Sequence, residues 1–436
     1  MEILSKKDNT LKYKAFSINN FRNIDQIYDT PIADHLGDLE VVGNVLPFKA
    51  NNYVVNQLID WSNVPSDPVF QLTFPQKEML SPEMFHKASE ALNSGLGKPY
   101  IKQEINEIRE TLNPHPADQI ELNVPSVEGL KYEGFQHKYD QTVLFFPKHG
   151  QTCHAYCSFC FRWPQFVGIK ELKFASQEVG LLIEYLKAHP GVTDILFTGG
   201  DPMVMNTERL KSYIEPLLSA NIPNLRNIRI GTKALGYWPY RFTHDKDAEE
   251  LLALFEKVNN SGYQLAFMAH FNHSKELSTE AVKKAIKRIR ATGTVIRTQA
   301  PVMKHINDSA AEWSKMIELQ IELGCIPYYM FIARDTGAQE YFAVPLDECY
   351  EIYTETMKNL SGLGRHLRGP VMSTSMGKMQ IIDILKGKTE KVLLLKCIQA
   401  RDNNQTGKTF LYKYKEGEVW LDLNRLQDLN ATSFNY

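Results

Sequence analysis

From about residue 143 onward, short apolar runs alternate with longer stretches in which apolar residues recur every three or four positions. Continuous apolar runs are typical of strands buried in a parallel sheet, and the second spacing is that of an amphipathic helix. Helices are expected near 177–188, 207–219, 246–259, 279–291 and 309–323. The strand candidates are VLFFP (143–147), DILFTG (194–199), NIRIGT (227–232), QLAFMAHF (264–271), TVIRTQAP (294–301) and IPYYMF (326–331).

Six strands that alternate with helices predict an α/β fold with parallel strands and right-handed crossovers. Either a doubly wound sheet or a partial (β/α) barrel fits, because six units are fewer than the eight that close a full barrel. We expect the core to span residues 141–345, between an N-terminal helical and irregular extension (1–140) and a C-terminal segment (346–436) that closes the active site.

The two flanking regions differ from the core in composition and in the elements they predict. The first is rich in Asn, Asp and Pro, and helices are expected near 51–61, 81–93 and 98–111. The second contains TFLYKYKEGEVWLDL (409–423), in which two alternating runs around Lys-Glu-Gly-Glu predict a β-hairpin.

The charge balance and the lengths of the apolar runs argue against several classes of protein. With 49 Lys+Arg against 51 Asp+Glu, the formal net charge of -2 argues against a general nucleic-acid binder. No apolar run reaches the roughly 18 residues of a membrane span. The opening MEILSKKDNTLKYK lacks the apolar region of a secretory signal. We expect a soluble, cytoplasmic protein with neither a nucleic-acid nor a membrane partner.

The six cysteines fall into two groups, and they are too sparse for a disulfide scaffold. Three of them are scattered beside apolar residues and are predicted to be small buried thiols: Cys325, Cys349 and Cys397. The other three lie within eight residues of each other, in a C-x3-C-x2-C loop that follows the first predicted strand. Active sites of parallel α/β units form at this end of the strands.

Cys153, Cys157 and Cys160 can converge on one metal centre. A structural zinc site prefers four ligands, and His154 would have to fold back to supply the fourth. An iron–sulfur cluster normally takes four thiolates, so three leave one iron able to bind a small molecule. The spacing alone leaves both centres open.

This cysteine loop resembles the signature of radical S-adenosylmethionine (SAM) enzymes. The resemblance implies a [4Fe-4S] cluster whose open iron binds SAM, and a partial (β/α)6 barrel in which the cluster loop follows strand one. One electron, supplied by a donor such as flavodoxin or ferredoxin, would cleave SAM to a 5′-deoxyadenosyl radical that abstracts hydrogen from the substrate.

Further segments resemble the lysine 2,3-aminomutase family, of which the chain looks like a divergent member. They cover roughly residues 45 to 400 and follow the family's order. The family tends to form homo-oligomers, so a homo-oligomer is expected. The segments are NNYVVNQLIDWSNVPSDPV (51–69), HKYDQTVLFF (137–146), TGGDP (198–202), IRIGTK (228–233), HFNHSKELST (270–279), TQAPVMKHIND (298–308) and PYYMF (327–331).

The resemblance assigns roles to individual residues. Arg162, two residues after the last clustered cysteine, matches the position that pairs with the substrate carboxylate, a role for which a guanidinium is suited by its bidentate fork. The expected SAM contacts fall on Gly199, Gly200, Asp201, His270 and Gln299. Taken in isolation, such a glycine turn is equally typical of an ordinary strand-to-helix connection.

Aminomutases of this family also use pyridoxal phosphate (PLP), bound covalently to a lysine after a glycine-rich loop. Without a gap, that lysine position falls on Lys378, in MSTSMGK, where only Gly377 remains of the glycines. The family's phosphate-binding Arg-Tyr…Arg set becomes Lys138, Tyr139 and Thr142, so one guanidinium is replaced and the other is lost. The sequence therefore leaves two enzymes open: a PLP-dependent aminomutase, or a PLP-free relative that catalyses oxidation, epimerisation or another rearrangement.

The substrate pocket also departs from the family. Two carboxylates that hold the distal ammonium of lysine fall on Arg334 and Val371, and Asp335 would replace one only after a one-residue shift. A cation in place of an anion would repel a lysine side chain. We therefore expect a small amino-acid substrate other than lysine, and Arg334 suits an acidic or amide side chain. A non-enzymatic iron–sulfur or zinc protein would not need the motifs that face SAM.

Overall fold

The computed structural model describes residues 11–113, 123–127, 130–167, 175–387 and 390–429. The first ten residues of the opening segment discussed above lie outside these ranges. In the described part of the chain, no helix combines the length and the apolar composition that crossing a membrane requires.

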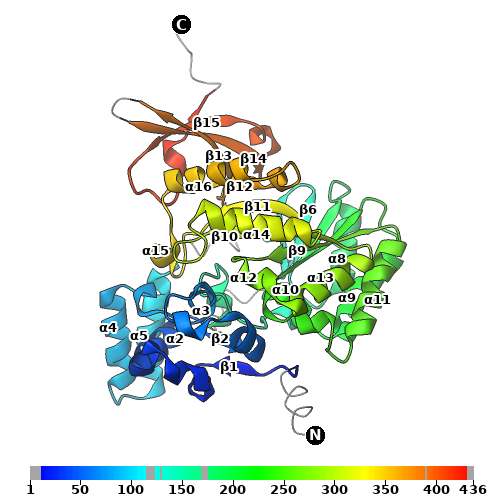
Figure 1. Cartoon of the computed structure of the whole chain (residues 1–436). Coiled ribbons are helices and arrows are strands. Elements are labelled where there is room, and N and C mark those ends of the chain that lie inside the picture. Colours follow the sequence, from blue (N-terminus) through cyan, green and yellow to red (C-terminus); the bar gives the residue numbers. More distant parts are fainter. Residues whose placement is uncertain (1–10, 114–122, 128–129, 168–174, 388–389, 430–436) are drawn as a thin grey trace.

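The molecule has a mixed α/β fold around one twelve-stranded sheet of order β16 to β5 (Figure 1). Every neighbouring pair from β6 to β12 is parallel. All six predicted strands are confirmed, and β12 is a further strand that the sequence did not indicate. These strands are β6 (Thr142–Phe145), β7 (Asp194–Phe197), β8 (Asn227–Thr232), β9 (Gln264–His270), β10 (Val295–Val302), β11 (Ile326–Ile332) and β12 (Arg368–Ser373).

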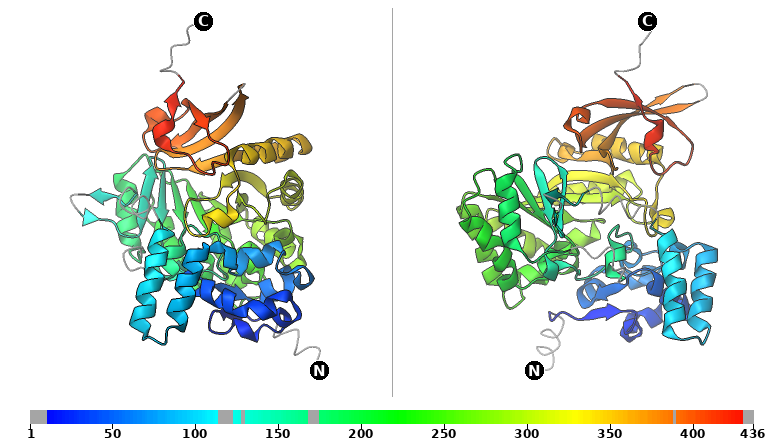
Figure 2. Two further views of the ribbon diagram at one scale, coloured as in Figure 1. Left: turned by 90° about the vertical axis from the view of Figure 1, so that its left-hand side faces the viewer. Right: turned by 180° about the vertical axis from the view of Figure 1, so that it is seen from behind.

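Helices cover the outer face of the parallel strands (Figures 1 and 2). In α13 the side chain of Thr279 caps the first turn by accepting from the Val282 amide, and the buried residues follow the expected spacing. All five helices predicted for the core are confirmed. The covering helices are α8 (Val179–Ala188), α9 (Thr207–Ser219), α11 (Ala248–Asn260), α13 (Glu280–Ala291), α14 (Ala310–Glu322) and α16 (Leu346–Asn359).

The N-terminal region packs helices and a small sheet below the carboxyl side of the parallel strands (Figure 1). The predicted helices near 81–93 and 98–111 are confirmed. The helix predicted near 51–61 is confirmed in a shorter form: residues 52–58 are helical, the last five as a π-helix (Val54–Leu58), and a 3-10 turn follows at Trp61–Asn63. The elements are β1 (Ala15–Ser17), α2 (Leu36–Val45), β2 (Lys49–Asn51), α3 (Pro68–Thr73), α4 (Pro82–Asn93) and α5 (Lys98–Thr111).

The C-terminal strands extend the large sheet in antiparallel fashion: β13 (Gly377–Lys386), β14 (Lys391–Ala400), β15 (Thr409–Tyr414) and β16 (Gln427–Asp428). The hairpin predicted over 409–423 is wrong, since β15 pairs with β14 and β16. The hydroxyl of Tyr412 donates to Glu418 and accepts from the Asp422 amide. These side-chain bonds fold the segment after β15 back on itself, without strand pairing.

The sheet curls so that β5 (Phe135–Tyr139), the edge strand that comes first in the chain, approaches the turn after β12. The ammonium of Lys138 donates to the carbonyl of Thr374, and Asn403 donates to Asp140 one residue beyond β5. Side chains on the inner face of the curled sheet are therefore brought together from both of its ends. The carboxyl ends of the parallel strands share one edge, where a site is expected.

Candidate active site

The three clustered cysteines lie on the loop between β6 and α7 (Trp163–Phe166), and all three are free thiols. Burial raises the pKa of each thiol. The pKa of Cys153 is raised further by Asp201, then by Cys160 and Cys157, so the three sulfurs share one neighbourhood. Within the described ranges, no three His, Cys, Asp or Glu side chains could hold a single metal ion. Three thiols on one loop are the donor set of a larger iron–sulfur cluster with an open iron, and that assignment stays a prediction.

The N-terminal region holds the cysteine loop by its backbone. Lys49 Nζ donates to the carbonyl of Cys153 (2.7 Å), and the Tyr156 amide donates to the carbonyl of Lys49 (2.7 Å). The amide group of Asn51, which is fully buried, donates to the carbonyl of His154 (3.2 Å). The extension before the core is therefore part of the site, a role that sequence reasoning missed.

Gly199 and Gly200 let the turn after β7 approach the cysteine loop. A Cβ on Gly200 would lie 2.5 Å from the amide nitrogen of Thr152, which is too close for any side chain. Gly199 has φ +138°, and a Cβ there would collide with the side chain of Gln151. The close approach of the two backbones explains both glycines, and their predicted contact with SAM stays a prediction.

Asp201 joins the ends of β7 and β8. Its carboxylate accepts from the hydroxyl of Thr232 (2.7 Å) and from the backbone amides of Lys233 (2.9 Å) and Met203 (2.9 Å). Burial raises its pKa to about 6, and these donors lower it. Among the described contacts Asp201 orders two strand ends beside the cysteine loop, and its predicted contact with SAM stays a prediction.

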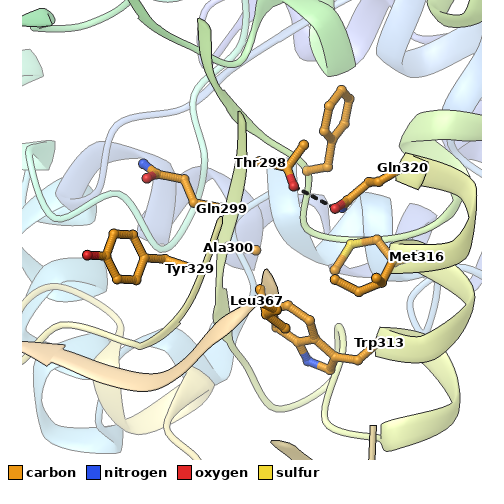
Figure 3. A pocket seen from close by; sticks show the side chains of 10 residues that line it. Thr298, Gln299, Ala300, Trp313, Met316, Gln320, Tyr329 and Leu367 are labelled. Atoms are coloured by element: carbon orange, nitrogen blue, oxygen red, sulfur yellow. Dashed lines mark hydrogen bonds between the residues drawn. The ribbon is translucent and has the colours of Figure 1, made fainter. Parts of the chain in front are cut away.

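His270 is the last residue of β9 and Gln299 lies within β10, and the two are register partners that form a pair. Gln299 Nε2 donates to His270 Nε2 across 2.7 Å, which requires a neutral imidazole. Burial lowers the pKa of His270 to about 3, and Lys233 and Arg162 lower it further. Figure 3 shows Gln299 and Tyr329 on one side of their strands, whereas Trp313, Met316 and Gln320 of α14 pack on the other.

Arg162 lies between the cysteine loop and the inner face of the sheet. Its guanidinium carbon lies 4.3 Å from the centre of the Phe146 ring and 5.3 Å from that of Phe161. In the described structure its buried NH1 group has no hydrogen-bond partner. Burial lowers its pKa to about 10, Cys160 and Cys153 raise it, and Arg334 lowers it.

Arg334 follows β11 and, like Arg162, lies near the ring of Phe161. Its guanidinium carbon lies 5.7 Å from the ring centre of Phe161 and 5.8 Å from that of Trp420. Its Nε is buried without a hydrogen bond in the described residues and lies 3.7 Å from Asp335 Oδ1. Two guanidinium groups with unused donors therefore share one aromatic partner.

Lys378, at the start of β13, lies next to Tyr139 of β5. Its Nζ is 5.1 Å from the ring centre of Tyr139 and 4.9 Å from that of Tyr329, and it donates to Gln399 Oε1 (2.7 Å). Burial lowers the pKa of this amine to about 7. The Tyr139 hydroxyl is itself buried beside Ser373, without a hydrogen bond of normal geometry.

A buried polar network behind Cys157 completes the site. Lys233 pairs with the fully buried carboxylate of Glu276 and lies 4.3 Å from the ring centre of Tyr237. The Cys157 thiol donates to the hydroxyl of Tyr237 (3.8 Å). Lys233 lies in the IRIGTK segment and Glu276 in the HFNHSKELST segment, so these two motifs are the sequence signal that could have indicated this network.

Comparison with known proteins identifies the class. The chain is 31% identical over 386 residues to an Aquifex aeolicus protein named "Putative L-lysine 2,3-aminomutase", covering 88% of this chain and 89% of that protein. It is 26% identical over 248 residues to the L-lysine 2,3-aminomutase of Escherichia coli, covering 56% of this chain and 68% of the relative. For the enzyme of Fusobacterium nucleatum the identity is 28% over 276 residues, covering 63% and 59%. No protein-family model matches the chain.

The protein is thus a radical SAM enzyme of the aminomutase type, that is, an isomerase. More narrowly, the chain belongs to the lysine 2,3-aminomutase family, as its motifs indicated. Enzymes of this family use a [4Fe-4S] cluster and SAM.

Proposed function

We propose that the protein cleaves SAM reductively, abstracts hydrogen from an amino acid other than lysine and moves its amino group to the neighbouring carbon. We also propose that its curled sheet is a partial (β/α)6 barrel. One observation carries this proposal: predicted site residues from distant segments form a continuous series. Arg162 lowers the pKa of His270, and Arg334 lowers the pKa of Arg162. The guanidinium carbons of Arg162 and Arg334 lie 5.3 Å and 5.7 Å from the ring centre of Phe161. Arg334 also lowers the pKa of Tyr139, whose ring centre lies 5.1 Å from Lys378 Nζ.

The cluster would be held by Cys153, Cys157 and Cys160. When bound and reduced, it supplies the electron that cleaves SAM. The protein would present three thiols on a loop fixed from the N-terminal region, and would keep a neutral His270–Gln299 pair on the neighbouring strands β9 and β10. A flavodoxin or ferredoxin as electron donor, and a homo-oligomeric state, belong to the same proposal.

PLP would be bound through Lys378. When bound, it supplies the group that carries the migrating nitrogen. An amine with a pKa of about 7 is largely neutral at physiological pH, and only a neutral amine is nucleophilic. The rings of Tyr139 and Tyr329 flank this amine and exclude water from it.

The two guanidinium groups support an amino acid with an acidic side chain as substrate. Arg162 would bind the carboxylate next to the amino group, as the family position implies, and Arg334 would bind a second carboxylate. Each has a buried N–H donor without a hydrogen bond in the described residues, although Arg334 Nε lies 3.7 Å from Asp335 Oδ1. Such a donor is costly unless a ligand accepts from it. A lysine side chain would instead place its ammonium against Arg334.

Loss of PLP binding in Lys378→Ala tests the cofactor assignment. Wild-type protein titrated with PLP should develop the visible absorbance of lysine-bound PLP, and Lys378→Ala should not. Lys386→Ala is the matched control, because Lys386 lies at the other end of the same strand and pairs with Glu351 at the surface. If the wild type binds no PLP but still releases 5′-deoxyadenosine from SAM, the PLP-free relative is the correct enzyme.

Charge reversal at Arg334 tests the substrate class. In Arg334→Asp, kcat/KM for an acidic amino acid should fall at least about tenfold, a loss of about 1.4 kcal/mol, because the carboxylate meets an anion. The ratio of lysine to acidic amino acid turned over should rise. Equal losses for both substrates would contradict a specificity role.

A further inference from the structure

Arg229 of β8 reaches across the inner face of the sheet toward β6. Its Nε donates to Asp194 Oδ1 on β7 (2.7 Å), and its NH2 lies 3.5 Å from the hydroxyl of Thr142 on β6. Thr142 and Asp194 are register partners on these neighbouring strands. Arg229 therefore places a guanidinium beside the position where a phosphate-binding arginine is expected from the resemblance and where this chain has a threonine.

Arg229 is one of three cations that surround the amine of Lys378. After burial, the pKa of Lys378 is lowered by Arg229, then by Lys138 and Arg368, and it is raised by Asp194. These cations come from β8, β5 and β12, so positive charge converges from both ends of the curled sheet. Arg368 is exposed, whereas Arg229 and Lys138 are partly buried, and a local concentration of positive charge favours the binding of an anion.

The ion pair with Asp194 does not use the whole guanidinium. An arginine has five N–H donors, and the described bonds engage one at short and one at long distance. The side chain of Arg229 is 19% exposed, so its remaining donors are not sealed in packed protein. A planar guanidinium binds phosphate oxygens in bidentate fashion, which a lysine cannot do.

We propose that Arg229 binds the phosphate group of PLP, with Lys138 and the hydroxyl of Tyr139, in place of the guanidinium absent at Thr142. This inference rests on the proposed binding of PLP to Lys378. It explains how the site holds a phosphate dianion although the sequence pattern for doing so is incomplete. The replacement comes from a different strand and so does not align with the residue it replaces.

Paired titrations with PLP and pyridoxal test the proposal, because pyridoxal lacks only the phosphate group. Absorbance titrations of the full-length protein freed of PLP would compare wild type, Arg229→Gln and the double variant D194N/R229Q. The double variant removes the carboxylate that Arg229→Gln leaves unpaired. Arg297→Gln is the matched control, since Arg297 lies on β10 with its guanidinium 5.4 Å from the ring centre of Tyr328.

Both Arg229 variants should bind PLP at least about tenfold more weakly than wild type while their affinity for pyridoxal changes less than about twofold. Arg297→Gln should bind both compounds like wild type. If wild type and the Arg229 variants bind PLP equally, or if PLP and pyridoxal are weakened by the same factor, Arg229 does not bind the phosphate. If the wild type binds neither compound, the proposed use of PLP fails first, and the inference with it.

Discussion

The surroundings of Lys378 determine the pKa of its amine. Its pKa is lowered from 10.5 to about 7 by burial and by the cations Arg229, Lys138 and Arg368, against the opposing effect of Asp194. The rings of Tyr139 and Tyr329 enclose the same amine. Because the charged form is the one disfavoured, the neutral nucleophile is available at a pH where an ordinary lysine is protonated.

The rate of PLP attachment should therefore depend on pH with a midpoint near 7. As pH rises through the pKa of Lys378, the neutral fraction rises, so the rate increases from about pH 6 and levels off above about pH 8. Stopped-flow absorbance measures it. Arg368→Gln removes one neighbouring cation and should move the midpoint upward. A rate that keeps rising to about pH 10 would show an unperturbed lysine and contradict this account.

At Gly200, the addition of a single methyl group should lower both stability and iron binding. In Gly200→Ala the new methyl group would collide with the backbone of Thr152, just before Cys153. We expect a loss of about 1–3 kcal/mol in the free energy of unfolding and less iron bound after reconstitution. Gly180→Ala, in α8 with open space around its Cβ position, is the control and should lower neither, since alanine is the better helix former. Urea denaturation and iron analysis measure both, and equal behaviour of the two variants would be inconsistent with the close approach.

Among the elements, the short strand β2 contributes most to the site for its length. It carries Lys49 and Asn51, whose side chains bind carbonyl groups of the cysteine loop. Asn51 also donates to the carbonyl of Tyr237 (2.9 Å), and its oxygen accepts from the amides of Tyr53 and Val54. One buried amide thus connects the N-terminal region, the cysteine loop and the end of α10 (Ala234–Tyr237), the short helix after β8.

Asn51→Leu should loosen the cysteine loop. The substitution leaves several buried backbone groups without partners, so we expect a loss of at least about 2 kcal/mol in the free energy of unfolding. Amide exchange should speed up in residues 151–160. Asn93→Ala is the control, because Asn93 bonds only within its own helix. Unchanged exchange in the loop would show that β2 does not hold it.

The predicted and observed strands show which structural elements can be recognised from sequence patterns. The strands β6 to β11 are short runs rich in apolar residues that alternate with helical stretches, and their prediction was confirmed. Strand β12 reads RGPVMS, in which Gly369 and Pro370 hide the pattern, so it was missed. The hairpin over 409–423 was wrong because alternation alone cannot tell a strand partner from a segment held by the side chains of Tyr412 and Tyr414.

For the whole molecule, the curl of the sheet determines which residues meet. The motifs predicted the individual site residues, but not that Lys378 would lie against Tyr139, because this contact depends on β13 approaching β5. Likewise, Arg229 could not be matched to Thr142 by position, since the two residues are on different strands. Such contacts form only when the sheet curls in three dimensions, and local sequence patterns do not report that curl.

The central claim is that this fold performs radical chemistry on an amino acid other than lysine. Protein reconstituted anaerobically with iron, sulfide and PLP would receive dithionite, SAM and either an acidic amino acid or lysine, with products followed by mass spectrometry. We expect 5′-deoxyadenosine together with a rearranged β-amino isomer of the acidic amino acid, and little turnover of lysine. Absence of 5′-deoxyadenosine with every substrate, or efficient rearrangement of lysine alone, would contradict this claim.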